Sequence, residues 1–175
     1  REGRQEAKHF IRATRATMKK TLWRALFWCT WPLIAFYSPL RTRSRMLVVH
    51  DDKFLVVKPC FGSGYWQLPG GGIKMLESGL QAAVREVREE AGLTIDPANV
   101  HLLMGLRTYY ENGLLKRYMV FATRVASTHA ARIRDYEIVD KSWLPLTGPF
   151  DGCAPHVIYA VRHYRAAKEQ GQLVN

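Results

Sequence analysis

Cysteine and long hydrophobic runs are both scarce in this sequence, and each shortage excludes a class of protein. The 3 cysteines among 175 residues lie far apart and in no Cys-x-x-Cys spacing, so neither a zinc site nor a disulfide framework is predicted. Free cysteines are typical of reducing compartments, which predicts a cytoplasmic protein. The longest uncharged stretch covers only residues 25–40 and contains two prolines, whereas a membrane-spanning helix needs about 20 apolar residues. The sequence therefore does not predict a membrane span.

Acidic residues are scarce near the beginning of the chain, where residues 1–45 hold eleven lysines and arginines but only two glutamates. This gives that segment a net charge of +9 and leaves +2 on the remainder. Residues 21–40 add an apolar stretch rich in tryptophan, phenylalanine and leucine. Six of the bases recur every three or four positions and would form one stripe on a helix: Arg1, Arg4, Lys8, Arg12, Arg15 and Lys19.

We expect residues 1–44 to form a basic and apolar helical extension, for which three interpretations stay open. In the first, the extension lies in the interface of an anionic membrane, which would make the protein membrane-peripheral. In the second, the apolar stretch packs on the following domain and the bases are solvated. In the third, "MKKTLW" from Met18 begins a signal peptide, although Arg24 interrupts the apolar run and no Ala-x-Ala site follows.

Residues 45–175 are predicted to form one domain of the α/β class with a mixed sheet, without repeats or linkers. Two aliphatic runs flank an Asp-Asp pair and predict a strand hairpin, and an Asn-Gly pair predicts a second, longer hairpin. Between them, a glycine-rich loop precedes a helix over residues 78–91 that ends at Gly92. The strand "EIVDKSWLPL" and an amphipathic helix beginning near Pro155 complete the domain.

The first of these helices carries three glutamates on the side away from its apolar stripe. At about 100° per residue, Glu86, Glu89 and Glu90 fall within about 100° of arc. Glu86 and Glu90 form an i,i+4 pair of like charge, which is unfavourable unless a cation lies between them. Hard divalent cations such as Mg²⁺ prefer oxygen ligands of this kind. The pattern therefore favours a metal site over a solvated helix face, although Arg85 also offers an ordinary ion pair to Glu89.

The spacing around this helix is more specific than its charge. It follows the pattern G-x5-E-x7-R-E-U-x-E-E-x-G-U, where U is aliphatic, filled by Gly71, Glu77, Arg85, Glu86, Val87, Glu89, Glu90, Gly92 and Leu93. With this 23-residue box, preceded by "WQLPGG", the sequence closely resembles the Nudix hydrolase family. The resemblance covers about residues 45–170. It implies a Nudix-like α/β/α sandwich, to which the N-terminal extension is an addition.

The resemblance also implies a reaction and a cofactor. Family members hydrolyse a nucleoside diphosphate linked to another moiety, such as a nucleoside triphosphate or a dinucleoside polyphosphate, by water attack on phosphorus. Mg²⁺ or Mn²⁺ would offset the charge of the pyrophosphate. One of the box glutamates or a later glutamate would act as the general base. Matching positions give as metal ligands Glu86, Glu89, Glu90, a loop carbonyl at Gly71, and Glu137 ahead of the tryptophan strand.

The remaining matched positions are implied to support the site. Arg85 would orient the helix carboxylates through ion pairs and belongs to the catalytic set, and Glu77 would brace the loop. Gly71 and Gly72 would let the backbone approach the site closely, and Gly92 would end the helix. Asp140 is the alternative for the acid beyond the box.

The substrate is indicated by weaker signals. Tyr109 and Tyr110 lie near where diadenosine polyphosphate hydrolases of this family carry a tyrosine, and Trp66 is another candidate to contact a nucleobase, although strand aromatics usually pack in the core. "WQLPGGGI" is also similar to RNA pyrophosphohydrolases, so an RNA 5′-pyrophosphohydrolase is an alternative, but the nearly neutral domain does not favour nucleic acid. A non-catalytic sensing module is the other alternative; such modules are expected to lose box carboxylates. The oligomeric state stays open, a homodimer included.

Overall fold

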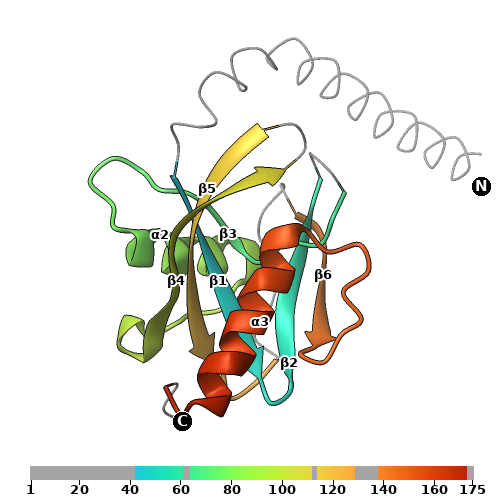
Figure 1. Cartoon of the computed structure of the whole chain (residues 1–175). Coiled ribbons are helices and arrows are strands. Elements are labelled where there is room, and N and C mark those ends of the chain that lie inside the picture. The colour runs from blue at the N-terminus through green and yellow to red at the C-terminus, as the bar shows by residue number, and fades with distance from the viewer. Residues whose placement is uncertain (1–41, 61–63, 112–113, 129–137, 173–175) are drawn as a thin grey trace, which may run out of the picture. The chain divides into compact units, whose positions relative to one another are not determined.

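The computed structural model describes residues 42–60, 64–111, 114–128 and 138–172 (Figure 1). The expected N-terminal extension lies almost entirely outside these residues. In the described part of the chain, no helix is long and apolar enough to cross a membrane.

A mixed sheet of six strands forms the centre of the described domain, in the order β4-β5-β1-β2-β6, with β3 paired beside β1. The strands are β1 (Thr42–His50), β2 (Lys53–Pro59), β3 (Gly70–Gly72), β4 (Val100–Glu111), β5 (Leu114–Arg124) and β6 (Ile138–Pro145). The helical elements are α2 (Gly79–Glu86), the π-helical turn η2 (Val87–Ala91), the 3-10 turn η3 (Pro97–Asn99) and α3 (Pro155–Glu169).

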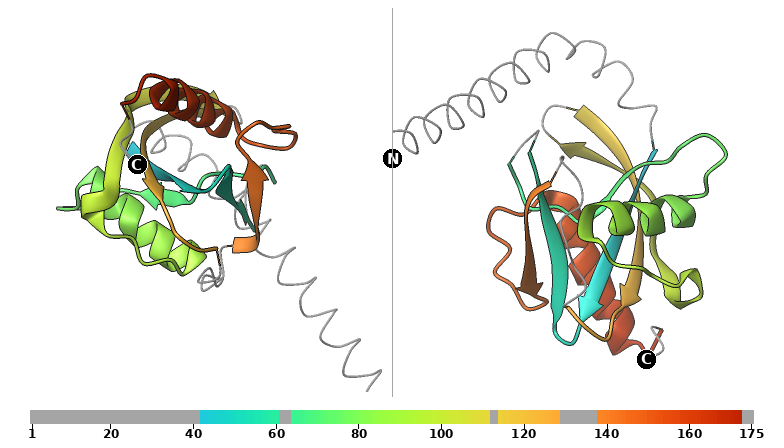
Figure 2. Two further views of the ribbon diagram at one scale, coloured as in Figure 1. Left: turned by 90° about the horizontal axis from the view of Figure 1, so that it is seen from below. Right: turned by 180° about the vertical axis from the view of Figure 1, so that it is seen from behind.

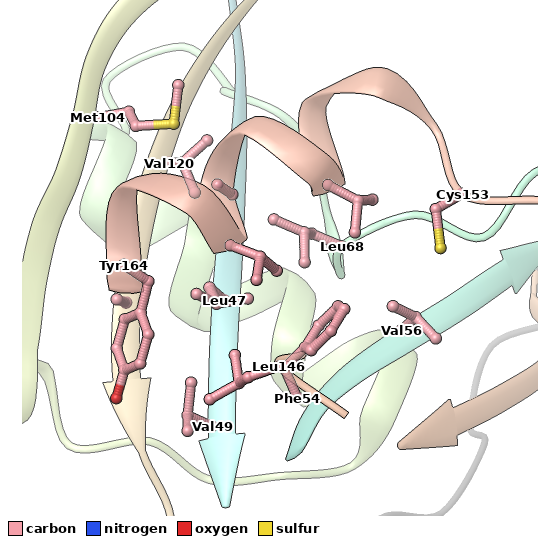
Figure 3. Packing of buried hydrophobic residues seen from close by; sticks show 14 of the residues in the cluster. Leu47, Val49, Phe54, Val56, Leu68, Met104, Val120, Leu146, Cys153 and Tyr164 are labelled. Carbon is pink, nitrogen blue, oxygen red and sulfur yellow. The ribbon is translucent and has the colours of Figure 1, made fainter. Parts of the chain in front are cut away.

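Helices α2 and α3 cover opposite faces of this sheet, which gives the predicted α/β/α layers (Figure 2). The central strand β1 is buried on both faces because its side chains alternate between the two layers. Leu47 and Val49 belong to the hydrophobic cluster under α3, whereas Met46 and Val48 belong to the cluster under α2. Figure 3 shows Leu47, Val49 and Leu68 among the side chains of the α3-side cluster. The mixed α/β fold is therefore confirmed.

Both predicted hairpins are present, and α3 begins at Pro155 as expected. Strand β1 pairs antiparallel with β2, and β4 pairs antiparallel with β5. Strand β1 also pairs with β5, but in parallel. Because β1 contacts three strands, it holds β3 and the loop that follows it against the middle of the sheet.

The helix predicted over residues 78–91 forms with one correction. Ser78 caps it through a capping box, in which its hydroxyl accepts from the N–H of Gln81 and its own N–H donates to the Gln81 side chain. At Val87 the α-helix changes to a π-helical turn, which ends at Gly92 with a left-handed φ of 70°. A π turn is wider than an α turn, and such turns are frequent at functional sites. The predicted helix and its end at Gly92 are therefore confirmed, and its last 5 residues, Val87–Ala91, are π-helical rather than α-helical.

Candidate active site

Arg85 on α2 links the helix to the glycine-rich loop. Its Nε and Nη2 donate to the two carboxylate oxygens of Glu77 at 2.7 and 3.0 Å. Its Nη1 donates to Glu86 Oε1 at 2.7 Å and to Glu89 Oε2 at 2.9 Å, and Nη2 also donates to the carbonyl of Gly72 at 3.1 Å. One guanidinium therefore contacts three box carboxylates and the loop backbone.

These contacts shift the pKa values of Glu77 and Arg85. The pKa of Glu77 falls to about 2, chiefly because Arg85 donates hydrogen bonds to it and secondarily because the N–H of Lys74 does so. The pKa of Arg85 is raised, first by its hydrogen bond to Glu77. Both groups are consequently charged at neutral pH, and the bidentate geometry fixes the loop relative to α2.

Glu86 lies directly against Gly71 in β3. A Cβ placed on Gly71 would overlap the Oε1 atom of Glu86 and lie 2.7 Å from its Cδ atom. Only a residue without a side chain allows this carboxylate to reach the loop backbone. The predicted close approach of loop and helix is thus found at Gly71, whereas a Cβ on Gly72 would meet no atom within 4 Å.

Glu90 has a different environment from the other two glutamates. It is buried, at 8% exposure, and its Oε2 accepts a hydrogen bond of 2.8 Å from the N–H of Gly70. The side chain of Glu89, by contrast, is 47% exposed and is engaged by Arg85. Both residues lie in the π-helical turn, in which Glu90 faces inward and Glu89 faces solvent.

The three glutamates are not gathered into one group in this arrangement. Within the described ranges, no three His, Cys, Asp or Glu side chains lie together so that they could hold a metal ion. Glu86 and Glu89 turn toward Arg85, and Glu90 turns toward Gly70. Their chemistry nevertheless fits a hard divalent cation, since such ions prefer carboxylate oxygens and the Glu86 carboxylate lies directly against the backbone of Gly71. Their role as metal ligands stays a prediction.

The predicted substrate contacts lie in the α3-facing layer. The ring of Tyr109 stacks on that of Tyr159 in α3, with centroids 5.4 Å apart and an interplanar angle of 29°. Burial raises the pKa of Tyr109. Trp66 packs partly buried against the same hydrophobic cluster, and Lys58 Nζ lies 5.4 Å from its ring centroid. Both aromatic residues therefore have packing roles, and a role in binding a nucleobase stays a prediction.

Three further predicted residues have no described contact with the box glutamates. Glu137 and the side chain of Tyr110 lie outside the described residues. Asp140 is exposed on β6, where its Oδ1 accepts from the N–H of Lys141 at 2.8 Å.

Two residues of the site were not singled out in the sequence. Gly70 supplies the N–H that binds Glu90, and Arg45 donates from β1 to the carbonyl of the same glycine. Arg45 is only 4% exposed. The only signal in the sequence is a charged residue at the start of the apolar run "RMLVVH". Arginine is seldom fully buried, so this signal by itself favours an exposed side chain.

A hollow of about 990 Å³ opens along the outer side of α2. It includes Arg85 and Glu89 but neither Glu86 nor Glu90. The hollow therefore lies to one side of the box carboxylates and does not enclose them. Its lining residues are Ser78, Leu80, Gln81, Val84, Arg85, Arg88, Glu89 and Pro97.

Comparison with known proteins identifies related sequences and folds. The family model described as the NUDIX domain matches residues 40–157. An RNA pyrophosphohydrolase of Halorhodospira halophila is 36% identical over 72 residues, which cover 41% of this chain and 39% of that protein. An oxidized purine nucleoside triphosphate hydrolase of Danio rerio is 33% identical over 94 residues, 53% of each protein. The chain thus spans about half or less of the length of these curated relatives.

Solved structures agree with the observed fold. A NUDIX hydrolase from Nitrosomonas europaea superimposes with a TM-score of 0.61 at 26% sequence identity. The match covers 73% of this chain and 90% of that one.

Proposed function

The chain belongs to the Nudix hydrolase family, and from this premise we propose that it hydrolyses a phosphoric anhydride bond of a nucleotide derivative. The substrate class is a nucleoside diphosphate linked to another moiety. The observation that carries the proposal is the set of contacts made by Arg85, which joins the carboxylates of Glu77, Glu86 and Glu89 beside the glycine-rich loop. A domain without catalytic activity would not need these three carboxylates to be held beside the glycine-rich loop.

Mg²⁺ or Mn²⁺ is the proposed cofactor, held by Glu86, Glu89 and Glu90. The carbonyl of Gly71 and, from outside the described residues, Glu137 are the proposed further ligands. When bound, the metal supplies positive charge against the pyrophosphate and makes water more acidic. The carboxylates carry the negative charge that such an ion requires, and Glu86 can approach the loop because Gly71 has no side chain.

The chain's own residues have distinct proposed tasks. Arg85 keeps Glu86 and Glu89 oriented through charged hydrogen bonds, which are stronger than neutral ones. Glu77 anchors Arg85 from the loop. One of the glutamates, Glu86, Glu89, Glu90 or Glu137, would accept the proton of the attacking water as general base.

Two kinds of substrate have specific support. The similarity to the zebrafish enzyme favours a nucleoside triphosphate, oxidised purines included. The similarity to the Halorhodospira enzyme favours the 5′ end of RNA, as a second candidate function. In either case we propose that Tyr109 or Trp66 contacts the base, because each ring is incompletely buried near the α3-facing layer.

Residues 1–44 are proposed to make peripheral contact with anionic membrane, on the sequence evidence of their basic and apolar composition. Sedimentation with vesicles containing anionic lipid would test this. Binding that neutral vesicles do not show supports it, and equal recovery in the supernatant rejects it. Size-exclusion chromatography with light scattering would test the open question of a homodimer.

A phosphate-release screen tests the hydrolase proposal directly. The panel contains nucleoside triphosphates, their oxidised forms, dinucleoside polyphosphates, ADP-ribose and 5′-triphosphate RNA, each with Mg²⁺ or Mn²⁺. Glu86→Gln removes one charge at almost unchanged volume, and Glu169→Gln at the exposed end of α3 is the matched control. We expect metal-dependent turnover in the wild type and the control but not in Glu86→Gln. Silence across the whole panel would contradict the hydrolase and favour a sensing module, whereas turnover that survives Glu86→Gln would contradict the proposed role of Glu86.

A further inference from the structure

A buried cation lies in the central strand, close to the site but outside the family box. Arg45 is 4% exposed and sits on the same face of β1 as Leu47 and Val49, which belong to the α3-side core. Removing a guanidinium from water is unfavourable unless its donors are satisfied by protein groups. An apolar side chain at this position would suit the core better, so the presence of arginine needs a reason.

The donors of Arg45 are directed at the segment that leads into β3. Nη1 donates to the carbonyl of Leu68 at 2.9 Å and also to the carbonyl of Gly70. Nη2 donates to Oε1 of Gln67 at 2.9 Å. Its Nε has no hydrogen-bond partner in the described part of the chain. The side chain thus fixes this loop through its hydrogen bonds but leaves one buried donor unsatisfied. Unsatisfied buried donors are more typical of functional sites than of residues that only stabilise the fold.

Gly70 connects this arginine with a box glutamate. Its carbonyl accepts from Arg45, while its N–H donates to Glu90 Oε2 at 2.8 Å. Gly70 has a φ of 143°, and a Cβ there would overlap the carbonyl oxygen of Ser44. The neighbouring carbonyl of Pro69 accepts from the N–H of Met46 at 2.9 Å. The peptide groups on both sides of Gly70 are consequently fixed by β1.

Aromatic rings support the guanidinium from the other side. It lies over the ring of Tyr118 in β5, 5.7 Å from the centroid. Tyr118 in turn stacks on His156 of α3, with centroids 4.9 Å apart. A cation between carbonyl oxygens and a π face has few positions available to it. The orientation of Arg45 is therefore set by the core itself.

We propose that Arg45 is a positioning residue for Glu90. By holding the carbonyls of Leu68 and Gly70, which lie on either side of the Pro69–Gly70 peptide, Arg45 keeps in place the N–H that orients the Glu90 carboxylate and so prepares that carboxylate to bind a divalent cation. The inference rests on the proposed function, in which Glu90 is a metal ligand. Groups that orient metal ligands from behind commonly affect metal affinity even though they never touch the ion.

Mn²⁺ binding to the full chain without substrate tests this role, measured by the loss of the free Mn²⁺ signal in electron paramagnetic resonance. Arg45→Met keeps the length of the side chain but removes all donors, and Arg45→Lys keeps the charge but cannot span both carbonyls. Val49→Ala, on the same strand face, is the control for general loss of core packing. We expect Arg45→Met to weaken Mn²⁺ binding by about tenfold or more, with Arg45→Lys intermediate. Val49→Ala should lower Tm without changing Mn²⁺ affinity.

The outcomes separate this inference from the proposed function. If the wild type binds Mn²⁺ and the folded Arg45 variants bind it equally well, Arg45 is only structural and the inference is overturned. If the wild type binds no Mn²⁺, the proposed metal site fails and the inference fails with it. Should Arg45→Met not fold, Gln67→Leu removes one anchor of the guanidinium and should weaken Mn²⁺ binding in the same direction. Unchanged Mn²⁺ binding in Gln67→Leu and Arg45→Lys would then overturn the inference.

Discussion

The Glu86 carboxylate occupies the space that a side chain on Gly71 would need. The two residues lie on different elements, β3 and α2, so their contact sets how closely the loop approaches the box helix. A methyl group at Gly71 would have to displace the carboxylate, whereas a methyl group at Gly72 would meet nothing within 4 Å. The adjacent glycines therefore form a matched pair for mutation.

We expect Gly71→Ala to lower kcat/KM by about tenfold to a hundredfold, because a displacement of about 1 Å at a reacting centre can cost that much. Gly72→Ala should stay within about threefold of the wild type, since no close approach to its Cβ position exists. Steady-state kinetics of the two variants under one metal concentration make the comparison. Equal losses in both variants would show that the Gly71–Glu86 contact is unimportant for hydrolysis.

Gly70→Ala should strongly lower the stability of the protein. The added Cβ overlaps backbone at Ser44, and a φ of 143° is strained for any residue with a side chain. We expect the free energy of unfolding to fall by about 3 kcal/mol or more. Gly171→Ala, with a φ of 65° but nothing within 4 Å, should cost only about 1 kcal/mol. Urea unfolding of both variants measures the difference, and similar losses would contradict the overlap at Gly70.

The Glu77–Arg85 pair predicts a specific acid sensitivity. The pKa of Glu77 is lowered from 4.5 to about 2, so its ionised form stabilises the fold above about pH 4.5. That contribution is lost as the pH falls through about 2. Because the pair is partly solvated, we expect about 1 kcal/mol in total. Urea unfolding of wild type and Glu77→Gln at several pH values should show a difference that shrinks below about pH 4.5; a constant difference would reject the pKa shift as its cause.

Tyr109→Ala separates nucleobase binding from packing. If a base stacks on Tyr109, its removal should raise KM by about fivefold or more while kcat changes little, because base stacking on an aromatic ring is worth about 1–3 kcal/mol. Tyr159→Ala removes the ring that stacks on Tyr109 and serves as the comparison. A lower Tm in both variants with unchanged KM would mean that the tyrosines only pack on each other.

Much of this fold could be predicted from the sequence because its signals are local. Aliphatic runs, an Asn-Gly pair and Pro155 mark strands, a hairpin and a helix start without knowledge of the rest of the chain. The π-helical turn at Val87 could not be predicted, because it accommodates Glu90 against Gly70, a partner outside the helix. The burial of Arg45 was missed for the same reason, since its acceptors lie on a segment 22 to 25 residues away.

Parallel pairing of β1 with β5 joins distant parts of the chain, from Thr42 with Arg117 to Val49 with Arg124. Closing so long a loop costs chain entropy before any contact repays it, so local hairpins form first. Strand β3 and helix α2 lie within that loop, and β3 pairs with β1. Pulsed hydrogen exchange during refolding should therefore find amides of the β4–β5 hairpin protected before those of β3. Because Phe121 of β5 belongs to the hydrophobic cluster under α2, a chain emerging from the ribosome would complete the core that supports the box helix only after β5 had been synthesised.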